Sequence, residues 1–596
     1  MGRKEAVDAN SRQLTETGSS IVTRRSFLVT GVAAVGATAA MGTADSAVAE
    51  TQGSRTARPS SFLDLLRVPD AVTAFQRFEQ TIPAGRIELV RRGERWTGER
   101  VEIETKVEGD ALKSTLHSPV TPIAVVHMRW LAEVVPMLKL LSDAWERSYG
   151  ELGWRNVIPE RVLPWYFATF DGELAHAYGV KTDARALCFW QLDPQGASLW
   201  LNVANGGSGV ELGDRVLAMA TIVSRQGGPD ESAADAVAGL CRAMCARTTR
   251  VAGPVYGAND WCYSYGNSTA ESILKDTDFI VEVSPSGGTR PFSVIDGGWT
   301  NGTAAWPDMG TLATAIKERN ARPGIWVRPL EAPANAAAGL LLPGARFGDR
   351  KGRSKELAYD PTVSEARENI QAKLRQAAAW GYEMVKHDFS TYDLLGQWGF
   401  EMGPQPTLPG WSLHDRSSTN AEVIADLYAL IREGVGERIM VDGCNTVGHL
   451  GQGVFEVQRI GDDTSGHQWE RTRRMGVNTL SFRLPQNDIF FKLDPDLVGL
   501  TEMIPWELNR QWLDVLARSG AATMVSAAPS MRGRVQKQAL REAFQVAAAG
   551  GTGARPADLL ETSAPEQWRE IHRTVGSREL RNRRNGVEGA SPFLAP

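Results

Sequence analysis

The second half of this 596-residue chain alternates short apolar segments with longer amphipathic ones, and this alternation limits the fold more than any other feature. Strands that alternate with helical segments are the pattern of parallel α/β architecture. The clearest helical periodicity lies in residues 364–380 and 420–433. The predicted strands are residues 260–263, 292–295, 324–327, 383–386, 438–441, 455–459, 489–492 and 521–525. Eight such units within residues 251–548 predict a (β/α)₈ TIM barrel rather than an open doubly wound sheet.

Residues 50–250 have a different period. In residues 86–90 and 100–105, apolar and polar side chains alternate, and similar segments follow, separated by turn residues. A period of two is typical of strands with one buried and one solvated face, so we expect an N-terminal antiparallel β-sandwich domain. Two stretches are instead predicted to be helices, residues 131–149 and 233–247. Residues 549–596 are polar and arginine-rich, which predicts a C-terminal tail that is partly disordered.

Residues 1–49 are predicted to be a twin-arginine signal peptide. Arg24 and Arg25 precede an apolar run, residues 27–41, that is too short to span a bilayer comfortably. Residues 47–49, Ala-Val-Ala, form a small-x-small cleavage site. The pattern therefore predicts export of a folded protein to the periplasm or the extracellular space, without stable membrane insertion. An uncleaved anchor is the alternative interpretation.

Composition and motif spacing disfavour several classes of function. The net charge of −5 is small for this length, so a nucleic-acid-binding face is not expected. The five cysteines are scattered and odd in number, which predicts neither a disulfide framework nor a zinc site. The eight histidines form no paired ligand motif, and no Gly-x-Gly-x-x-Gly opens a helix after a strand. We therefore predict that the protein uses no metal and no cofactor.

Acidic side chains gather where the predicted strands end. Asp296 follows the second strand, Asp388 the fourth and Asp442 the fifth, and Asp462 and Asp463 follow the sixth. Acids in such loops often cap the next helix, so one of them alone proves little. In a barrel, however, all the carboxyl ends of the strands open onto the same mouth. We expect these carboxylates to converge there.

The fourth strand end favours a specific chemistry. Lys386 lies two residues before Asp388, and a nearby ammonium lowers the pKa of a carboxylate and keeps it ionised. An ionised carboxylate can attack a sugar carbon, whereas the alternative is a purely structural ion pair. Retaining glycoside hydrolysis needs a second carboxyl group about 5–5.5 Å from the first. Asp462 or Asp463 could supply it as the acid/base.

Tryptophan is abundant, with 18 residues, and three of them lie near the first three strand ends. Trp261, Trp299 and Trp326 are predicted to form the floor of a cleft, because the apolar face of a sugar stacks well on indole. For each of them, packing beneath a loop is the alternative.

The motifs FSVIDGGW, PGIWVRP, MVKHDFS, DGCN and RIGDDTS occur in the order seen in clan D glycoside hydrolases. Together with NDWCYSYG they resemble the α-galactosidase (melibiase) group over roughly residues 254–530. The resemblance implies a retaining mechanism through a covalent glycosyl-aspartate, without metal or cofactor. It implies Asp388 as the nucleophile and Asp462 as the acid/base, with Asp463 as the alternative. The expected substrate contacts are Asp296, Trp299, Trp326, Lys386, Cys444, Arg459 and Asp463.

Two positions depart from the family pattern. Gly297 stands where the group usually has a second aspartate, and Arg328 and Pro329 stand where it often has glutamate and proline. The expected substrate is an oligosaccharide or glycoside with an α-galactoside-like linkage. Another α-linked hexose, an N-acetylated hexose and a β-L-arabinopyranoside are the alternatives. A transglycosylase of the same fold and a non-catalytic carbohydrate-binding protein are the alternative functions, and the oligomeric state is left open.

Overall fold

The computed structural model describes residues 61–571 and 577–580, apart from residues 136, 251, 302–305, 348–356 and 397–406. The predicted signal peptide lies outside the described residues. Within the described ranges, every helix is too short or too polar to cross a membrane. Residues Pro59–Pro596 group as one compact unit, to which all the sheets and helices below belong.

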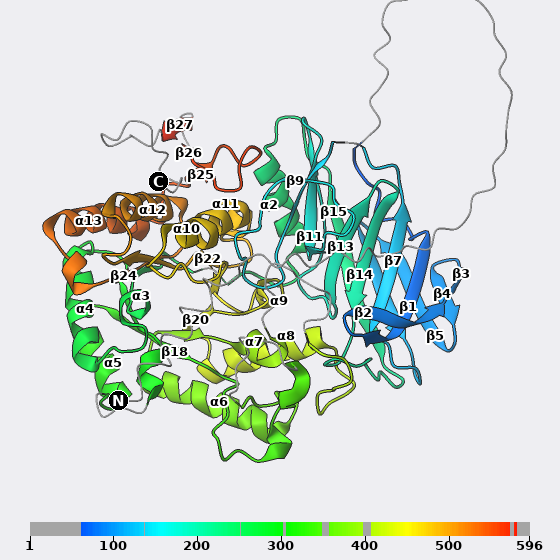
Figure 1. Ribbon diagram of the computed structural model, residues 1–596, viewed down its shortest axis with the longest axis horizontal. Coiled ribbons are helices and arrows are strands. Elements are labelled where there is room, and N and C mark those ends of the chain that lie inside the picture. The colour runs from blue at the N-terminus through cyan, green and yellow to red at the C-terminus, as the bar shows by residue number, and fades with distance from the viewer. Residues whose placement is uncertain are drawn as a thin grey trace, which may run out of the picture. The chain divides into compact units, whose positions relative to one another are not determined.

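Two antiparallel sheets come first in the chain (Figure 1, blue to green). One has six strands in the order β10-β13-β14-β7-β1-β2, and the other has nine in the order β3-β4-β5-β6-β15-β12-β11-β8-β9. Their bounds are Ala71–Glu79 (β1), Ile82–Glu88 (β2), Val90–Arg92 (β3), Arg95–Gly98 (β4), Val101–Glu108 (β5), Ala111–His117 (β6), Val125–Leu131 (β7), Lys139–Ser142 (β8), Arg155–Asn156 (β9), Leu163–Pro164 (β10), Tyr166–Phe170 (β11), Ala175–Val180 (β12), Leu187–Asp193 (β13), Gly196–Asn202 (β14) and Val216–Arg225 (β15).

The two sheets share a core, as the period of two predicts. In β5, Val101, Ile103 and Thr105 are buried while the residues between them are partly exposed. Phe167 of β11 packs edge-on against Trp190 of β13, with ring centroids 5.5 Å apart, and so joins the two sheets. The antiparallel part of the fold is therefore as expected from its alternating pattern.

The helix predicted over residues 131–149 is wrong. That segment contains β8, which ends at Ser142, and then an irregular stretch. Every residue from 141 to 149 is buried. An amphipathic helix keeps one face in water, and this stretch has no such face. Arg483 instead donates hydrogen bonds to the carbonyl oxygens of Ala144 and Glu146, at 3.2 and 2.7 Å, which satisfies backbone groups that a helix would have paired internally.

Nine parallel strands form the second half of the fold, in the order β22-β21-β20-β19-β18-β17-β16-β24-β23. The two strands at the ends of this order, β22 and β23, follow each other in the chain with only Pro495 and Asp496 between them. The Ala522 N–H also donates to the Leu493 oxygen at 2.8 Å. Both ends of the sheet therefore lie at one bend of the chain. The bounds are Tyr256–Asn259 (β16), Phe292–Ile295 (β17), Arg322–Val327 (β18), Met384–His387 (β19), Met440–Gly443 (β20), Val457–Arg459 (β21), Lys492–Asp494 (β22), Leu497–Leu500 (β23) and Thr523–Ala527 (β24).

One of the predicted strands is wrong, and a second overlaps its observed strand by a single residue. Residues 260–263 fall mostly in a helical turn, because β16 ends at Asn259, whose side chain accepts the Trp261 N–H at 2.9 Å. Of residues 489–492 only Lys492 belongs to a strand, because Asp488, with φ 58°, turns the chain before β22 begins. The other six predicted strands overlap the observed ones.

Helices connect most of the parallel strands, and α6 packs against α8 while α12 packs against α13 (Figure 1). The predicted helices at 233–247, 364–380 and 420–433 are confirmed as α2, α6 and α8. Helix α8 begins with a capping box, in which Thr419 and Glu422 each accept a backbone N–H of the other. The bounds are Ala233–Met244 (α2), Trp261–Ser264 (α3), Ala270–Val283 (α4), Met309–Glu318 (α5), Ser364–Ala379 (α6), Ser390–Leu395 (α7), Asn420–Val435 (α8), Gly448–Gly451 (α9), Trp469–Thr472 (α10), Thr479–Arg483 (α11), Trp506–Ser519 (α12) and Arg534–Ala548 (α13). Short 3₁₀ or π turns are Gly297–Asn301, Ala338–Leu340, Gly344–Phe347, Arg473–Asn478, Leu484–Gln486 and Pro529–Met531.

The segment after residue 549 contains ordered strands where a loosely docked tail is expected. Arg555–Pro556 (β25), Trp568–Ile571 (β26) and Ser577–Leu580 (β27) form a small antiparallel sheet. Trp568 is buried, and Glu570 pairs with Arg518 of α12 at 2.5 Å. Burial of the indole and this ion pair attach β26 to the parallel part of the fold.

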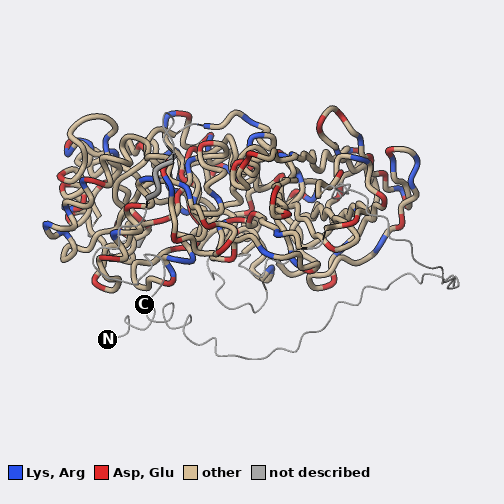
Figure 2. The backbone as a smooth tube through the Cα atoms, turned by 90° about the horizontal axis from the view of Figure 1, so that it is seen from above, with Lys and Arg blue, Asp and Glu red and all other residues tan. Residues whose placement is uncertain are grey.

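Charged residues of both signs are interspersed along the described chain (Figure 2). Many form exposed pairs, such as Lys275 with Glu271, and water screens these so strongly that they contribute little. The ion pairs that matter for the site are the buried ones described below.

Candidate active site

A cavity of about 340 Å³ lies at the carboxyl ends of the parallel strands. It brings together residues that the sequence places after β17, β18, β19 and β21. Of the predicted site residues, those that line it are Asp296, Trp326, Lys386, Asp388, Arg459 and Asp463. Trp299, Cys444 and Asp462 are not among its lining residues. Of the five acidic side chains expected to converge, Asp296, Asp388 and Asp463 therefore do so, whereas Asp442 and Asp462 are not among the lining residues.

Asp388 is held by three hydrogen bonds. Its Oδ2 accepts from Trp326 Nε1 at 3.0 Å, and its Oδ1 accepts from Asn445 Nδ2 at 2.5 Å and from the Phe389 N–H at 2.7 Å. Burial alone would raise the pKa of this carboxyl, but the Lys386 charge and the bonds from Asn445 and Trp326 outweigh burial and lower it below the ordinary value. The Asp388 carboxylate is thus ionised and fixed in direction.

Phe389 supports this arrangement through an unusual backbone conformation. Its φ of 61° lies in the left-handed region, which a bulky residue rarely adopts. The sharp turn begins helix α7 and directs the Phe389 N–H back to Asp388. Backbone strain of this kind is concentrated at functional sites.

Lys386 pairs directly with Asp296 and acts on Asp388 through its charge. Its Nζ lies 3.0 Å from Asp296 Oδ2, and both side chains are buried. The same Asp296 oxygen accepts a bond from Asn259 Nδ2 at 2.7 Å. Burial would lower the pKa of Lys386, but the Asp296 charge outweighs it and keeps the pKa well above the usual range. The lysine is therefore cationic and immobile at the base of the cavity.

Arg459, at the end of β21, binds a second carboxylate that lines the cavity, that of Asp463. Its Nη2 lies 2.8 Å from Asp463 Oδ1, and its Nη1 lies 3.1 Å from Asp496 Oδ1. Arg459 is almost fully buried, whereas the Asp463 side chain is 42% exposed and lines the cavity. Burial raises the pKa of Asp463, but Arg459 and then Arg147 outweigh it and hold the pKa well below its ordinary value.

Asp462 is held away from the cavity by two guanidinium groups. Arg147 Nη2 lies 2.9 Å from its Oδ1, and Arg471 Nη2 lies 2.8 Å from its Oδ2. Both carboxylate oxygens are thus occupied, and the side chain is only 14% exposed. The neighbouring Asp463 faces the space in which a substrate would sit.

The tryptophans divide between the cavity wall and the layer behind it. Trp326 and Trp261 line the cavity. Trp299 Nε1 donates to the Trp326 carbonyl oxygen at 2.9 Å, and the Trp299 ring packs edge-on against Trp380. Trp299 therefore supports the wall from behind. Cys444 is buried and accepts a weak hydrogen bond from Arg459 Nη1 at 3.7 Å.

Among the polar residues of the cavity wall that the sequence did not reveal, three bind predicted site residues directly. Asn445 ends the DGCN motif and could have been found from that position, and Asp496 follows β22 in the same way. Arg147 belongs to the antiparallel part of the chain, between β8 and β9. No local pattern marks it, because only the packing of the two parts of the fold brings it to the cavity.

Arg328, one of the two departures from the family pattern, forms a buried fork with Asp393. Its Nε and Nη2 lie 2.8 and 2.6 Å from the two carboxylate oxygens, and its guanidinium lies over the Phe389 ring at 4.6 Å. Both side chains are at most 9% exposed. The pair braces the left-handed turn that follows Asp388.

Replacement of Arg328 by alanine is expected to destabilise the protein by about 3–5 kcal/mol, because the buried Asp393 carboxylate would lose the guanidinium that binds both of its oxygens. Thermal melting of the purified protein measures this loss. The double variant Arg328→Met/Asp393→Leu should recover much of the stability, since it removes both charges. A single variant that melts like the wild type would show that the fork has no such role.

A pair of buried carboxyl groups lies in the interior beneath the cavity. Asp442 and Asp494 line a void of about 20 Å³ together with Lys386 and Asp496. Burial and the Asp494 charge raise the pKa of Asp442 well above its ordinary value. A proton on Asp442 removes one negative charge near Lys386 and leaves the lysine to Asp296.

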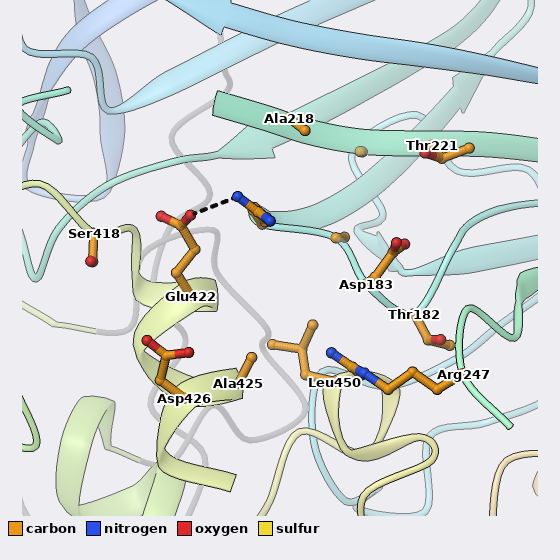
Figure 3. A pocket seen from close by; sticks show the side chains of 13 residues that line it. Thr182, Asp183, Ala218, Thr221, Arg247, Ser418, Glu422, Ala425, Asp426 and Leu450 are labelled. Atoms are coloured by element: carbon orange, nitrogen blue, oxygen red, sulfur yellow. Dashed lines mark ion pairs between the residues drawn. The ribbon is translucent and has the colours of Figure 1, made fainter. Parts of the chain in front are cut away.

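A larger cavity of about 390 Å³ lies elsewhere, between β15 and α8 (Figure 3). Arg185 and Glu422 approach each other across it at 3.6 Å, and Asp183 and Asp426 lie on different walls. None of the predicted catalytic residues and no aromatic side chain is among its described lining residues. The larger volume therefore does not mark the candidate site, which is the cavity that the predicted residues line.

Comparison with known proteins gives matches in structure and none in sequence. No protein-family model matches the chain, and no curated protein does. An α-galactosidase from Thermus thermophilus, solved in complex with stachyose, is 18% identical with a TM-score of 0.54, over 77% of this chain and 99% of that one. A family 36 α-galactosidase from Geobacillus stearothermophilus is 11% identical with a TM-score of 0.53, over 85% and 77%. One from Lactobacillus brevis is 9% identical with a TM-score of 0.52, over 85% and 75%.

At such identities, the similarity establishes a shared fold. The resemblance to the α-galactosidase group that the ordered motifs predict is thus confirmed at the level of the fold. A shared fold does not assign catalytic roles, which depend on the geometry of this chain's own residues.

Proposed function

We propose that this protein is a retaining glycoside hydrolase that acts on α-galactoside-like linkages, with Asp388 as nucleophile and Asp463 as acid/base. The observation that carries the proposal is that these two carboxylates line one cavity, and that three hydrogen bonds orient Asp388. We take the nine parallel strands as a (β/α)₈ barrel in which β22 and β23 together serve as the seventh strand. The cavity then occupies the mouth at which barrel enzymes place their chemistry.

In the first step, an oxygen of Asp388 attacks the anomeric carbon of the sugar. The bond from that carbon to the leaving oxygen breaks, and Asp463 delivers a proton to this oxygen. Trp326 and Asn445 hold the attacking carboxylate in direction, so little reorganisation is needed. The product is a glycosyl ester of Asp388 with the configuration of the sugar inverted.

In the second step, water enters the space that the leaving group has vacated. Asp463, now ionised, takes a proton from this water, whose oxygen attacks the anomeric carbon and releases Asp388. The second inversion restores the original configuration. The Lys386 and Arg459 charges near Asp463 favour its ionised form in this step.

We assign the acid/base role to Asp463 instead of Asp462, which the motif resemblance favours. Asp463 lines the cavity, whereas both oxygens of Asp462 face arginines. A proton donor must reach the leaving oxygen within hydrogen-bond distance, directly or through one water. Asp463 meets this condition because its side chain lines the cavity, whereas that of Asp462 does not.

The sugar is proposed from the relatives and from the cavity wall. The Thermus thermophilus relative is solved with the oligosaccharide stachyose. In this chain Gly297 lines the cavity, and a Cβ added there would meet the Trp326 ring at 3.6 Å, an ordinary contact distance. The position is therefore open to a larger group, of the substrate or of a side chain.

A panel of aryl glycosides tests the proposal. The mature chain is expected to hydrolyse aryl α-galactosides, and proton NMR should show the α-anomer as the first product. Inversion of configuration would contradict the two-step mechanism. Sugar binding by calorimetry without hydrolysis of any glycoside would favour a non-catalytic protein, and transfer to an added acceptor sugar in place of water would identify a transglycosylase.

We also propose that the protein is exported by the twin-arginine route. Replacement of Arg24 and Arg25 by lysine is expected to retain the precursor in the cytoplasm, because the pair is a receptor-read address. Cell fractionation with an antibody to the mature chain measures this. The same distribution for wild type and variant would contradict the export assignment.

A further inference from the structure

The antiparallel part of the fold delivers one residue to the cavity, and its placement is specified by the backbone. Ser148 pairs with Gly461 in an isolated parallel bridge. The Ser148 N–H donates to the Ile460 oxygen at 2.8 Å, and the Asp462 N–H donates to the Ser148 oxygen at 2.9 Å. The chain next to Arg147 thus extends the sheet at the end of β21, directly beside Asp462 and Asp463.

Further contacts fix this segment. The Ser148 and Thr479 hydroxyl oxygens lie 2.7 Å apart, and Arg483 donates to the Ile460 oxygen at 2.9 Å and to Asp143 at 2.7 Å. All of these groups are buried. A segment bonded on both sides in this way has little freedom to shift, so the position of the Arg147 side chain is set by the fold.

The Arg147 guanidinium lies between the two consecutive carboxylates. Its Nη2 is 2.9 Å from Asp462 Oδ1, and its Nη1 is 3.6 Å from Asp463 Oδ1. Arg147 lines the cavity with Asp463, while Asp462 does not. Arg471 completes the arrangement, with Nη2 2.8 Å from Asp462 Oδ2 and Nε 2.5 Å from the Asp463 carbonyl oxygen.

We propose that Arg147 is a positioning residue for Asp463, and that Asp462 is the anchor that keeps Arg147 at the cavity wall. This inference rests on the proposed function, because it gives Asp463 the acid/base role. Asp462 takes the closer contact with Arg147 and leaves Asp463 the looser one. Arg459 and Arg147 together favour the ionised form of Asp463, which the second step of the mechanism requires, whereas the first step needs the proton that this pairing opposes.

Arg147 and Asp462 have opposite effects on the proton affinity of Asp463. A guanidinium favours its ionised form, and a neighbouring carboxylate disfavours it. The other charged or titratable groups that act on Asp463, or on which it acts, are Arg459, Lys386, Asp496, Tyr265 and Cys262. These are unchanged in variants of Arg147 and Asp462, so the comparison isolates the pair.

The experiment is the pH dependence of kcat/KM for an aryl glycoside with a poor leaving group. Its basic limb reports deprotonation of the acid/base in the free enzyme. Arg147→Gln should move this limb to higher pH by roughly one unit or more, because an opposite charge is lost. Asp462→Asn should move it to lower pH, because a like charge is lost. Arg147→Lys, which keeps the charge, should stay close to the wild type.

Arg471→Gln is the matched control. Arg471 also pairs with Asp462, but it does not line the cavity, so its loss should shift the limb less than that of Arg147. A general loss of packing would not move Arg147→Gln and Asp462→Asn in opposite directions. Limbs that coincide in these two variants and the wild type would overturn the proposal.

A measurement that needs no activity separates this proposal from the proposed function. Carbon-13 NMR of aspartate-labelled protein, with the Asp463 signal assigned by its absence in Asp463→Asn, follows the titration of that carboxyl directly. The midpoint should be higher in Arg147→Gln than in the wild type, even if no glycoside is hydrolysed. An unchanged midpoint would overturn the role of Arg147, whereas a shifted midpoint in an inactive protein would refute only the hydrolase assignment.

Discussion

Replacement of Asp388 by asparagine is expected to lower kcat for aryl α-galactosides by roughly 10⁴-fold or more, because the nucleophile of the first step is lost. The fold should be unchanged, since asparagine has the same shape and can still accept the hydrogen bond from Trp326 Nε1. Steady-state kinetics and thermal melting, measured on the same preparation, check both expectations. Asp426→Asn is the matched control, because Asp426 lines the other cavity and should leave kcat unaffected.

An external nucleophile sharpens this test. In the shorter variant Asp388→Ala, azide should occupy the space that the carboxylate leaves, attack the anomeric carbon as the aglycone departs, and form a glycosyl azide of inverted configuration. NMR of the product identifies it. Full activity of Asp388→Asn would remove Asp388 from the mechanism, whatever the behaviour of Asp463.

The pH dependence of the wild type provides a second measure of the same residue. The pKa of Asp388 lies below its ordinary value, and the group must be ionised to attack. The acidic limb of kcat/KM should therefore lie below about pH 3.9, the ordinary pKa of an aspartate. Trp326→Phe removes one hydrogen bond to the ionised form and should move that limb to higher pH.

Asp463→Asn is expected to lower kcat/KM for phenyl glycosides by about 10²–10⁴-fold, the usual contribution of a general acid. Glycosides with a 2,4-dinitrophenol leaving group need no proton, so their first step should be nearly unaffected. The second step still needs a base, so the glycosyl-enzyme should accumulate and give a burst of dinitrophenol. Stopped-flow absorbance measures both rates.

Asp462→Asn distinguishes the two adjacent carboxylates. Asp462 is held between Arg147 and Arg471 and does not line the cavity, so its loss should lower the rate with phenyl substrates far less than Asp463→Asn does. If Asp462→Asn instead shows the strong dependence on the leaving group and Asp463→Asn does not, then Asp462 is the proton donor. That outcome would return the assignment to the one that the sequence motifs favour.

Much of the fold follows from periodicity. The alternating segments predicted the antiparallel sheets. Six of the eight predicted parallel strands overlap observed ones over two or more residues, and a seventh overlaps only at Lys492. The two failures have local causes, the Asn259 side-chain cap and the turn at Asp488, which apolar periodicity does not register. The helix predicted over residues 131–149 was wrong for another reason. Residues 141–149 are all buried, so their apolar and polar residues do not alternate with the period of a half-exposed helix or strand.

The sequence predicted which side chains at the strand ends line the cavity better than it predicted the contacts that these side chains make. Six predicted residues line the cavity, because parallel strands must bring their carboxyl ends to one side of the sheet. Which residue each side chain contacts depends on the direction in which the side chain points, and the sequence does not give that direction. Lys386 binds Asp296 and not Asp388, and Trp299 lies behind Trp326 instead of facing the cavity.

The sequence by itself determined that Asp388 ends a buried strand behind a lysine, and that two further acids follow a strand two positions along the same sheet. Only the tertiary structure decided which of those two acids faces the cavity. Consecutive residues at a strand end point in different directions, and the one that turns away does so because Arg147 and Arg471 hold both of its oxygens. Arg147 lies in the irregular segment between β8 and β9, distant in the chain, so no local pattern could have revealed this choice.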